Sequence, residues 1–249
     1  MYPILFKFGF IQIYSYGLMI ALAFGVSTAL LSRQARELGR PKDFFWYFSV
    51  WVLLGGIFGG RLLYIALNFE FFAQNPREIP ALWHGGLIWY GALAGGLLSG
   101  MGYLRSKKAG VIKTLDLVVP FVALGQAIGR IGCFLNGCCY GRPAKWGIYF
   151  PAHKDYLISV QLISSLNLLV IFILLRLLQE IKPKPGKVLA AYLIIASFER
   201  FMVEFIRNDS PRDFWGLTVF QLISAAIFIG GILLWCVISW FYPKKPASA

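Results

Sequence analysis

Residues 111–141 read VIKTLDLVVPFVALGQAIGRIGCFLNGCCYG, an apolar segment that runs into a turn rich in glycine and polar residues. A helix needs about 20 apolar residues to cross a bilayer, and residues 111–129 approach that length. The stretch from Gly129 to Gly141 then places an arginine, an asparagine and three cysteines among four glycines. An arginine in hydrocarbon costs about 2.5–3.5 kcal/mol on insertion scales, so we expect Arg130 to have an anionic partner. The stretch therefore predicts a site at the end of a membrane helix.

The whole chain has the composition of a membrane protein. Of its 249 residues, 58% are hydrophobic, 17% are aromatic and only 14% are charged, which excludes disorder and is too apolar for an ordinary soluble domain. Seven segments have the length of membrane helices: residues 13–31, 44–67, 86–104, 111–129, 157–178, 188–206 and 217–240. We therefore expect an all-α integral membrane protein of about seven transmembrane helices. Residues 1–249 should form a single polytopic membrane domain with no large soluble domain.

The basic residues predict the orientation of these helices. The formal net charge is +13, and most Lys and Arg residues fall within residues 33–42, 105–113, 176–187 and 244–245. These segments all lie on one side of the seven expected helices, and the positive-inside rule assigns that side to the cytoplasm. The N-terminus is therefore expected outside and the C-terminus in the cytoplasm. Topology and attraction to anionic lipid account for the charge, and nucleic acid is therefore excluded as a partner.

The unusual polar residues then fall at the outer ends of three helices. They are His84 before segment 86–104, Arg130 after segment 111–129, and Glu204 with Arg207 at the end of segment 188–206. An arginine guanidinium matches phosphate with two parallel hydrogen bonds. The free amides of a helix opened by Gly85 and Gly86 would add a second anion-binding element. An anionic phospholipid head group is the simplest ligand for such a set.

Three of the polar residues also have structural interpretations. Arg130 can snorkel to the membrane interface, and His84 can be an ordinary interfacial histidine instead of a general base. Arg61 lies deeper, after a glycine run in segment 44–67. It can bind a ligand, pack within the bundle, or pair with Asp116. These alternatives remain open at the level of the sequence.

Glu204 has two interpretations of its own. It lies four residues after Arg200 and three residues before Arg207, so the three side chains share one helix face. Glu204 is either half of a structural ion pair with Arg200 or a functional carboxylate. The structural pair would leave Arg207 free for a ligand.

The four cysteines allow several chemistries. Cys133, Cys138 and Cys139 lie on the outer side, whereas Cys236 lies within segment 217–240. A structural zinc site needs four well-placed nitrogen or sulfur ligands, and the spacing C-x4-C-C is poor for it. A disulfide from Cys133 to Cys138 or Cys139 and a catalytic thiolate beside the arginine are the alternatives. Small buried side chains are the default, and we expect no metal site.

Five stretches of the chain resemble the prolipoprotein diacylglyceryl transferase family. The anchors are Tyr16-Gly17-Leu18-Met19, Gly59-Gly60-Arg61, His84-Gly85-Gly86-Leu87, the signature region from Gly129 to Gly141, and Arg-Phe-x-x-Glu-Phe-x-Arg from Arg200 to Arg207. The signature region is specific. The other four are individually weak but occur in the right order, and the resemblance extends over nearly the whole chain.

This resemblance implies a seven-helix enzyme of the bacterial cell membrane. Such an enzyme transfers a diacylglyceryl group from phosphatidylglycerol to the lipobox cysteine thiol of a preprolipoprotein, and glycerol 1-phosphate leaves. No cofactor is implied. A thiol with a pKa of about 8.5 needs a base, and His84 is suited to take that proton. Arg130 and Arg207 would stabilise the departing phosphate. The substrate-binding residues are then expected to be Tyr16, Arg61, Gly85, Gly86, Asn136, Gly137, Gly141 and Glu204.

The sequence departs from the family at the signature region and after it. Many members carry asparagine in place of Cys133 and an acidic residue in place of Cys138. The family's His-Pro-x-Gln-Leu-Tyr-Glu run is represented by residues 158–164, which keep only Gln161 and Leu162 of the named positions. The alternatives are therefore a paralogue that uses the same lipid with another acceptor, or a carrier for an anionic lipid or solute. A carrier would be expected to show inverted repeats, and none is visible.

Overall fold

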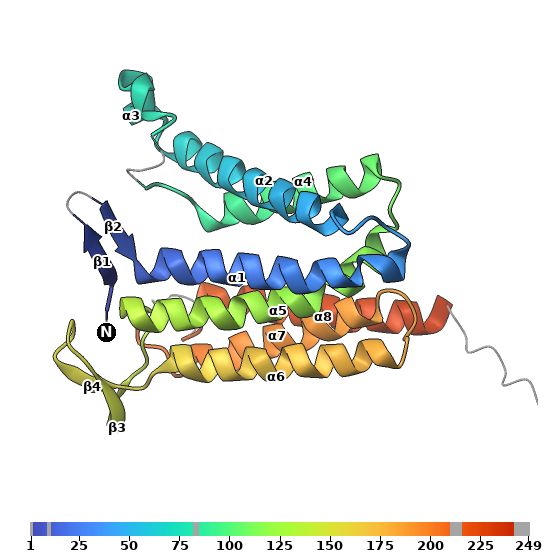
Figure 1. The fold of residues 1–249 in the computed structure, drawn as a ribbon. Coiled ribbons are helices and arrows are strands. Elements are labelled where there is room, and N and C mark those ends of the chain that lie inside the picture. The colour runs from blue at the N-terminus through green and yellow to red at the C-terminus, as the bar shows by residue number, and fades with distance from the viewer. Residues whose placement is uncertain (1, 9–10, 82–84, 210–215, 242–249) are drawn as a thin grey trace, which may run out of the picture. The chain divides into compact units, whose positions relative to one another are not determined.

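The computed structural model describes residues 2–8, 11–81, 85–209 and 216–241 (Figure 1). Its helices are α1 (Ser15–Ser32), α2 (Phe44–Leu67), α3 (Phe69–Gln74), α4 (Trp89–Ser106), α5 (Val111–Asn136), α6 (Val160–Glu180), α7 (Lys187–Glu204) and α8 (Val219–Phe241). Two antiparallel hairpins pair β1 (Ile4–Phe8) with β2 (Ile11–Tyr14) and β3 (Pro143–Phe150) with β4 (Asp155–Leu157). Each of the seven predicted segments contains a long helix, so the expectation of a mainly helical chain is confirmed.

Within the described ranges, five helical segments are long and apolar enough to cross a membrane. They are Ser15–Arg36, α2, α5, α6 and α8. α4 and α7 have 18 residues each, but α4 is rich in glycine and α7 carries Lys187, Glu199, Arg200 and Glu204. The helices are those of a multi-pass membrane protein. The count of seven spans and the orientation of the termini stay predictions.

The chain forms two compact units, residues 1–31 with 115–249 and residues 32–114. In the first unit α1, α5, α6, α7 and α8 lie side by side, and the hairpins extend from the end at which α1 begins and α5 ends (Figure 1). Part of its core is a cluster of buried aliphatic residues from three helices: Val119, Ala123 and Ala127 of α5, Leu168, Ile171 and Leu175 of α6, and Val188 and Ala191 of α7. Close packing of this kind is what holds helices together in lipid.

Asp116 of α5 joins two helices of the first unit. Its carboxylate oxygens accept hydrogen bonds from the backbone N–H groups of Gly186, at 2.5 Å, and Leu189, at 2.8 Å. The start of a helix has free N–H groups and the positive end of the helix dipole, so a carboxylate is stabilised there. Asp116, which the sequence offered as a partner for Arg61, therefore caps α7.

The second unit is organised by the antiparallel contact between α2 and α4. Its glycines face one another, because a Cβ atom on Gly59 would meet the carbonyl oxygen of Gly91 and one on Gly95 would meet that of Gly55. Small residues four positions apart let helix backbones approach in this way in membranes. Tyr103 closes the far end of the contact by donating a hydrogen bond to the carbonyl of Phe44, at 3.1 Å.

Of the helix boundaries that differ from the expected ones, two concern the site. The helix expected at 111–129 continues to Asn136, so Arg130 lies within α5 rather than after it. The residues that follow Arg130 are still mostly apolar, and the helix stops only at Gly137, whose φ is 81°. The helix expected from 86 begins at Trp89. Gly85 and Gly86 have φ values of 79° and 81°, which a helix does not accept, so they do not supply its first amides.

Candidate functional site

The signature region begins with a helix cap. The N–H of Cys138 donates to the carbonyl of Cys133 at 3.2 Å, and the N–H of Gly137 donates to that of Phe134 at 3.1 Å. These two bonds, with a left-handed glycine between them, form a Schellman motif at the end of α5. Gly137 is required for its conformation, since a side chain at φ 81° would be strained. Asn136 lies exposed at the last position of the helix.

The chain beyond this cap lies between two other loops. Gly141 pairs with Arg207 in an isolated antiparallel bridge, and its N–H donates to the carbonyl of Ile158 at 2.9 Å. Further backbone bonds join Arg142 to Ile206 at 3.0 Å and Asn208 to Tyr140 at 3.3 Å. A Cβ atom on Gly141 would lie 2.7 Å from Val160. The glycine thus allows three segments far apart in sequence to meet, and it fixes Arg207 beside the signature region.

Arg207 is held by two carboxylates. Its Nε and NH2 groups donate to the two oxygens of Asp209, both at 2.9 Å, and its NH1 lies 3.6 Å from Glu204. Burial lowers the pKa of the Arg207 guanidinium, but the hydrogen bond to Asp209 and the charge of Glu204 outweigh that effect and raise it. The side chain is 9% exposed. Arg207 is therefore a fixed positive charge whose orientation is set by Asp209.

Glu204 contacts both Arg200 and Arg207, the two arginines that share its helix face. Its fully buried carboxylate lies 3.0 Å from Arg200 and 3.6 Å from Arg207, and Thr218 donates a hydrogen bond to its other oxygen at 3.2 Å. The structural pair with Arg200 is present. It does not leave Arg207 without a carboxylate neighbour, because one carboxylate serves both arginines.

Arg130 contrasts with these paired arginines. Its side chain is partly buried, and among the residues described here its guanidinium makes no hydrogen bond or ion pair. Its charge nevertheless acts on Glu199 and Arg200 of α7 and on Tyr16 of α1. Glu199 is 9% exposed, and its Oε1 has no hydrogen-bond partner in the described part of the chain. The expected anionic partner is therefore near Arg130 but not bonded to it.

Tyr16 and the polar end of α5 belong to the same end of the first unit. A Cβ atom on Gly132 would lie 3.4 Å from the ring of Tyr16, so α1 and α5 are close there. The Tyr16 hydroxyl is within electrostatic reach of Arg130 and of the three cysteines of the signature region. The structure thus gathers most of the predicted residues of this unit at one end: Tyr16, Arg130, Asn136, Gly137, Gly141, Glu204 and Arg207.

Cys133, Cys138 and Cys139 form a cluster of free thiols. The sulfur atoms of Cys133, Cys138 and Cys139 all lie within 4.8 Å of one another. Hydrogen bonds with the other two thiols lower the pKa of Cys138. Cys139 has a φ of 63°, which is uncommon for a residue with a side chain. Among the described residues, these three cysteines are the group whose spacing would allow them to bind a metal ion. The sequence analysis expected no metal site.

Arg61 of the second unit has a guanidinium enclosed by backbone. It donates to five carbonyl groups: Glu78, Ile79, Ala81, Gly85 and Gly86. Its cationic group also lies over the rings of Tyr64 and Phe72, with centroid distances of 5.6 and 5.3 Å. Arg61 is 7% exposed. Of its possible roles, packing is the one that these contacts describe.

The segment before α4 follows from this enclosure. Gly86 lies directly under Arg61 and Tyr64, so a Cβ atom there would meet both side chains. Ile88 then donates to the carbonyl of Gly60 at 3.1 Å, which joins the segment to α2. His84, the predicted base, immediately precedes these glycines but lies outside the described residues.

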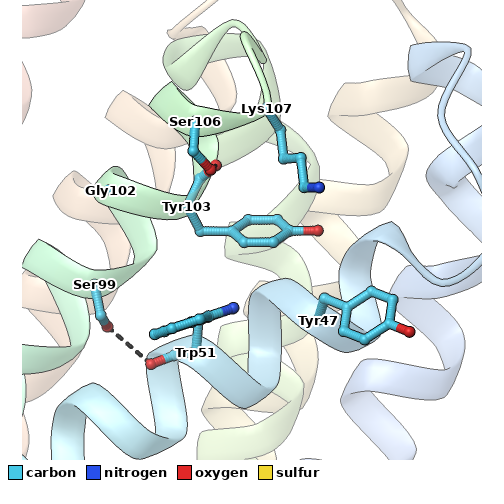
Figure 2. A pocket seen from close by; sticks show the side chains of 7 residues that line it. All are labelled: Tyr47, Trp51, Ser99, Gly102, Tyr103, Ser106 and Lys107. Atoms are coloured by element: carbon cyan, nitrogen blue, oxygen red, sulfur yellow. Dashed lines mark hydrogen bonds between the residues drawn. The ribbon is translucent and has the colours of Figure 1, made fainter.

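A hollow of about 490 Å³ lies at the other end of the α2 and α4 contact (Figure 2). Its lining residues are Tyr47, Trp51, Ser99, Gly102, Tyr103, Ser106 and Lys107. Ser99 donates to the backbone carbonyl of Trp51 at 2.9 Å, and the tyrosine rings leave the hollow largely apolar (Figure 2). None of the predicted site residues lines it. This hollow is therefore not part of the predicted site.

Several polar residues near the signature region were missed in the sequence. Gln161 is fully buried, and its side-chain amide donates to the carbonyl of Cys138 at 2.6 Å. Its Oε1 has no hydrogen-bond partner among the described groups. Glu199, Asp209 and Thr218 were not predicted either. Only Gln161 gave a signal in advance, since it is one of two positions retained in residues 158–164.

Comparison with known proteins identifies the family of the chain. The profile of the prolipoprotein diacylglyceryl transferase family matches residues 3–237. A relative from Clostridium tetani, named phosphatidylglycerol–prolipoprotein diacylglyceryl transferase, is 38% identical over 242 residues, which cover 94% of this chain and 96% of the relative. A second, numbered 2 in Clostridium perfringens, is 38% identical over 233 residues (90% and 91%), and one from Synechococcus elongatus is 33% identical over 259 residues (98% and 88%). The chain belongs to the prolipoprotein diacylglyceryl transferase family.

Proposed function

We propose that this protein transfers a diacylglyceryl group from phosphatidylglycerol to the lipobox cysteine of a preprolipoprotein. The thiol loses its proton, a sulfur–carbon bond forms, and the carbon–oxygen bond to glycerol 1-phosphate breaks. The family and the names of its relatives support this reaction. The observation that carries it is the guanidinium of Arg130, which bonds to none of the described residues and lies at the end of the first unit that also holds Arg207.

The two arginines have different parts in this proposal. The donors of Arg130 bond to none of the described residues, so Arg130 binds the phosphate of the lipid and stabilises it as charge develops on leaving. Arg207 is oriented by Asp209 and Glu204 and supplies a fixed positive charge. Tyr16 and Asn136 are both exposed and would hydrogen-bond the head group. Gly137 and Gly141 keep the backbone of the signature region in place for these contacts.

His84 is proposed as the base that takes the thiol proton, because an unperturbed imidazole has a pKa of about 6.5 and a thiol one of about 8.5. Arg61 would contribute indirectly. Its hydrogen bonds to Gly85 and Gly86 hold the segment that directly follows His84. Arg61 would then position this segment and would not contact the substrate. Gly85 and Gly86 would let the backbone approach the Arg61 guanidinium.

The membrane arrangement is part of the same proposal. Seven helices would cross the bacterial cell membrane, with the N-terminus outside and the C-terminus in the cytoplasm, as a single membrane domain. The basic segments 33–42, 105–113 and 176–187 would then lie in the cytoplasm and the signature region at the outer side. Both substrates would meet the site from the membrane or from outside.

The test uses the full-length protein in detergent with phosphatidylglycerol and a synthetic lipobox peptide. We expect release of glycerol phosphate together with a gain of one diacylglyceryl mass on the peptide. His84→Ala and Arg130→Ala should abolish both signals, whereas Lys145→Ala, which removes an exposed charge from β3, should not. A peptide in which serine replaces cysteine should give neither signal.

The paralogue remains the second candidate because residues 158–164 keep so little of the family run. It predicts that phosphatidylglycerol binds in an Arg130-dependent manner while the lipobox peptide gains no mass. That result would contradict the proposed acceptor and retain the lipid site. Lipid binding that is independent of Arg130 would contradict the site itself.

A further inference from the structure

The thiols of Cys133 and Cys138 are brought together by the cap of α5. In a Schellman motif the third residue from the helix end and the second residue beyond it have their side chains in contact. Here those positions are Cys133 and Cys138, whose backbones are joined by the 3.2 Å bond described above. The Cys138 sulfur also lies 3.7 Å from the carbonyl oxygen of Cys133. Their proximity is thus a property of the cap.

Cys139 adds a third sulfur at a conformational cost. Its φ of 63° belongs to the left-handed region, which residues other than glycine seldom occupy. Gln161 holds this part of the turn, since its amide donates to the carbonyl of Cys138. With this turn the three sulfur atoms lie within 4.8 Å of one another, and all three residues are partly exposed.

Three mutually close thiols are a donor set for a soft metal ion. Zinc–thiolate bonds of about 2.3 Å place sulfur atoms about 3.8 Å apart in a tetrahedral site. Contraction from 4.8 Å requires shifts below about 1 Å, which side-chain rotation provides. A disulfide would use two of the sulfur atoms and leave the third unused. A tris-thiolate ion site uses all three.

We propose that Cys133, Cys138 and Cys139 bind one Zn²⁺ ion, with the fourth position open to an exchangeable ligand. Three protein ligands with one open position are the pattern of catalytic zinc sites rather than structural ones. Thiols are the ligands that such an ion prefers. If the proposed function holds, on which this second step rests, the acceptor cysteine is a ligand of the right class. It would bind as a thiolate after His84, the proposed base, takes its proton.

The experiment uses the full-length protein in detergent under reducing conditions, loaded with Zn²⁺ alone or with Co²⁺ as a spectroscopic probe. We expect one ion per chain and the thiolate-to-cobalt charge-transfer bands of a sulfur-rich site. Cys133→Ser, Cys138→Ser and Cys139→Ser should each weaken binding by about 100-fold or more. Cys236→Ser removes the fourth thiol of the chain, from α8, and should leave binding unchanged.

Equal affinity in wild type and in the three cluster variants would overturn the metal site. So would a disulfide between two of these cysteines in the reduced protein, measured by mass after alkylation. The open position is tested by adding the lipobox peptide to the Co²⁺ form. Its cysteine version should shift the charge-transfer bands and its serine version should not. Glycerol phosphate release in the same samples reports the transferase separately, so an inactive protein that binds zinc leaves the metal site intact.

Discussion

Arg61 and Arg130 follow similar sequences but have opposite surroundings. Each follows a glycine in an apolar helix, in Gly59-Gly60-Arg61 and Gly129-Arg130. The guanidinium of Arg61 donates to five backbone carbonyls, whereas that of Arg130 bonds to none of the described residues. Two arginines that cost the same to place in a membrane are therefore used in two ways. Arg61 bonds to the backbone of its own chain, whereas Arg130 is proposed to use its donors for a ligand.

The comparison shows that a charged residue in an apolar helix has a role, because burying it is costly. The cost does not show whether that role is structural or functional. Carbonyl oxygens satisfy a guanidinium without a carboxylate, and five described residues between α3 and α4 supply them to Arg61. The end of α5 offers fewer acceptors, because the Schellman motif uses the carbonyls of Cys133 and Phe134. Substitutions at the two arginines should consequently separate stability from activity.

Arg61→Ala should produce the largest effect, on folding of the second unit. A buried carbonyl that loses its partner costs about 1–3 kcal/mol, so several together should lower the free energy of unfolding by at least about 3 kcal/mol. The measurement is the thermal midpoint in detergent and the yield of monodisperse protein. Arg61→Lys should recover only part, because an ammonium group cannot reproduce the planar fork. An Arg61→Ala protein as stable as wild type would show that the carbonyls find water instead.

Arg130→Ala should leave stability nearly unchanged and remove activity. Loss of one donor that stabilises a developing anion typically lowers kcat by about 10²–10³-fold. Because no described residue bonds to Arg130, the thermal midpoint should change by the equivalent of less than about 1 kcal/mol. Glycerol phosphate release and thermal unfolding of one preparation check both statements. A marked loss of stability with activity retained would reverse the roles of the two arginines.

The helices were largely predictable because hydrophobic length is a direct constraint in lipid. The segment expected at 44–67 has the bounds of α2. The end of α5 was placed too early because Arg130 was taken as a stop, whereas the helix ends only where Gly137 adopts a positive φ. The two hairpins were not predicted. Their strands are short, and the β1–β2 and β3–β4 pairs each depart from regular register.

The site was predictable in its charged residues but not in their partners. Arg130 and Arg207 were found from the cost of a cation near hydrocarbon. Asp209 and Thr218 were not predicted. Asp209 contacts Arg207 and Thr218 contacts Glu204 only in the folded chain, and no local sequence pattern indicates these contacts. The backbone bridge between Gly141 and Arg207 is likewise a tertiary contact that no local pattern encodes.

The glycines before the two arginines sharpen the same comparison at a smaller scale. A Cβ atom on Gly59 would meet the backbone of Gly91 and Gly95, so Gly59→Ala should cost about 1–3 kcal/mol through overpacking. At Gly129 the added atom would lie 3.5 Å from Ile20, an ordinary contact. Gly129→Ala should therefore stabilise α5 by up to about 1 kcal/mol. Thermal midpoints of the two variants should move in opposite directions. A shift of equal sign would mean that the two glycine runs serve one purpose.

Asp209→Asn tests whether Arg207 is intermediate between Arg61, which is fully bonded, and Arg130, which bonds to no described residue. Asp209 holds the guanidinium of Arg207 through two hydrogen bonds of 2.9 Å, and its side chain is 23% exposed. Partly exposed pairs are worth up to about 1 kcal/mol, which corresponds to a factor of about 5 in an equilibrium constant. Removing this anion frees donors and raises the attraction for phosphate, so the KM for phosphatidylglycerol should fall by up to about 5-fold. The looser guanidinium should lower kcat by a similar factor.

The matched control is Asp155→Asn. It changes an exposed carboxylate of β4, which accepts a hydrogen bond from the backbone N–H of its neighbour Tyr156. If KM rises instead, Asp209 orients Arg207 for the lipid more than it competes with it, and Arg207 resembles Arg61 more than Arg130.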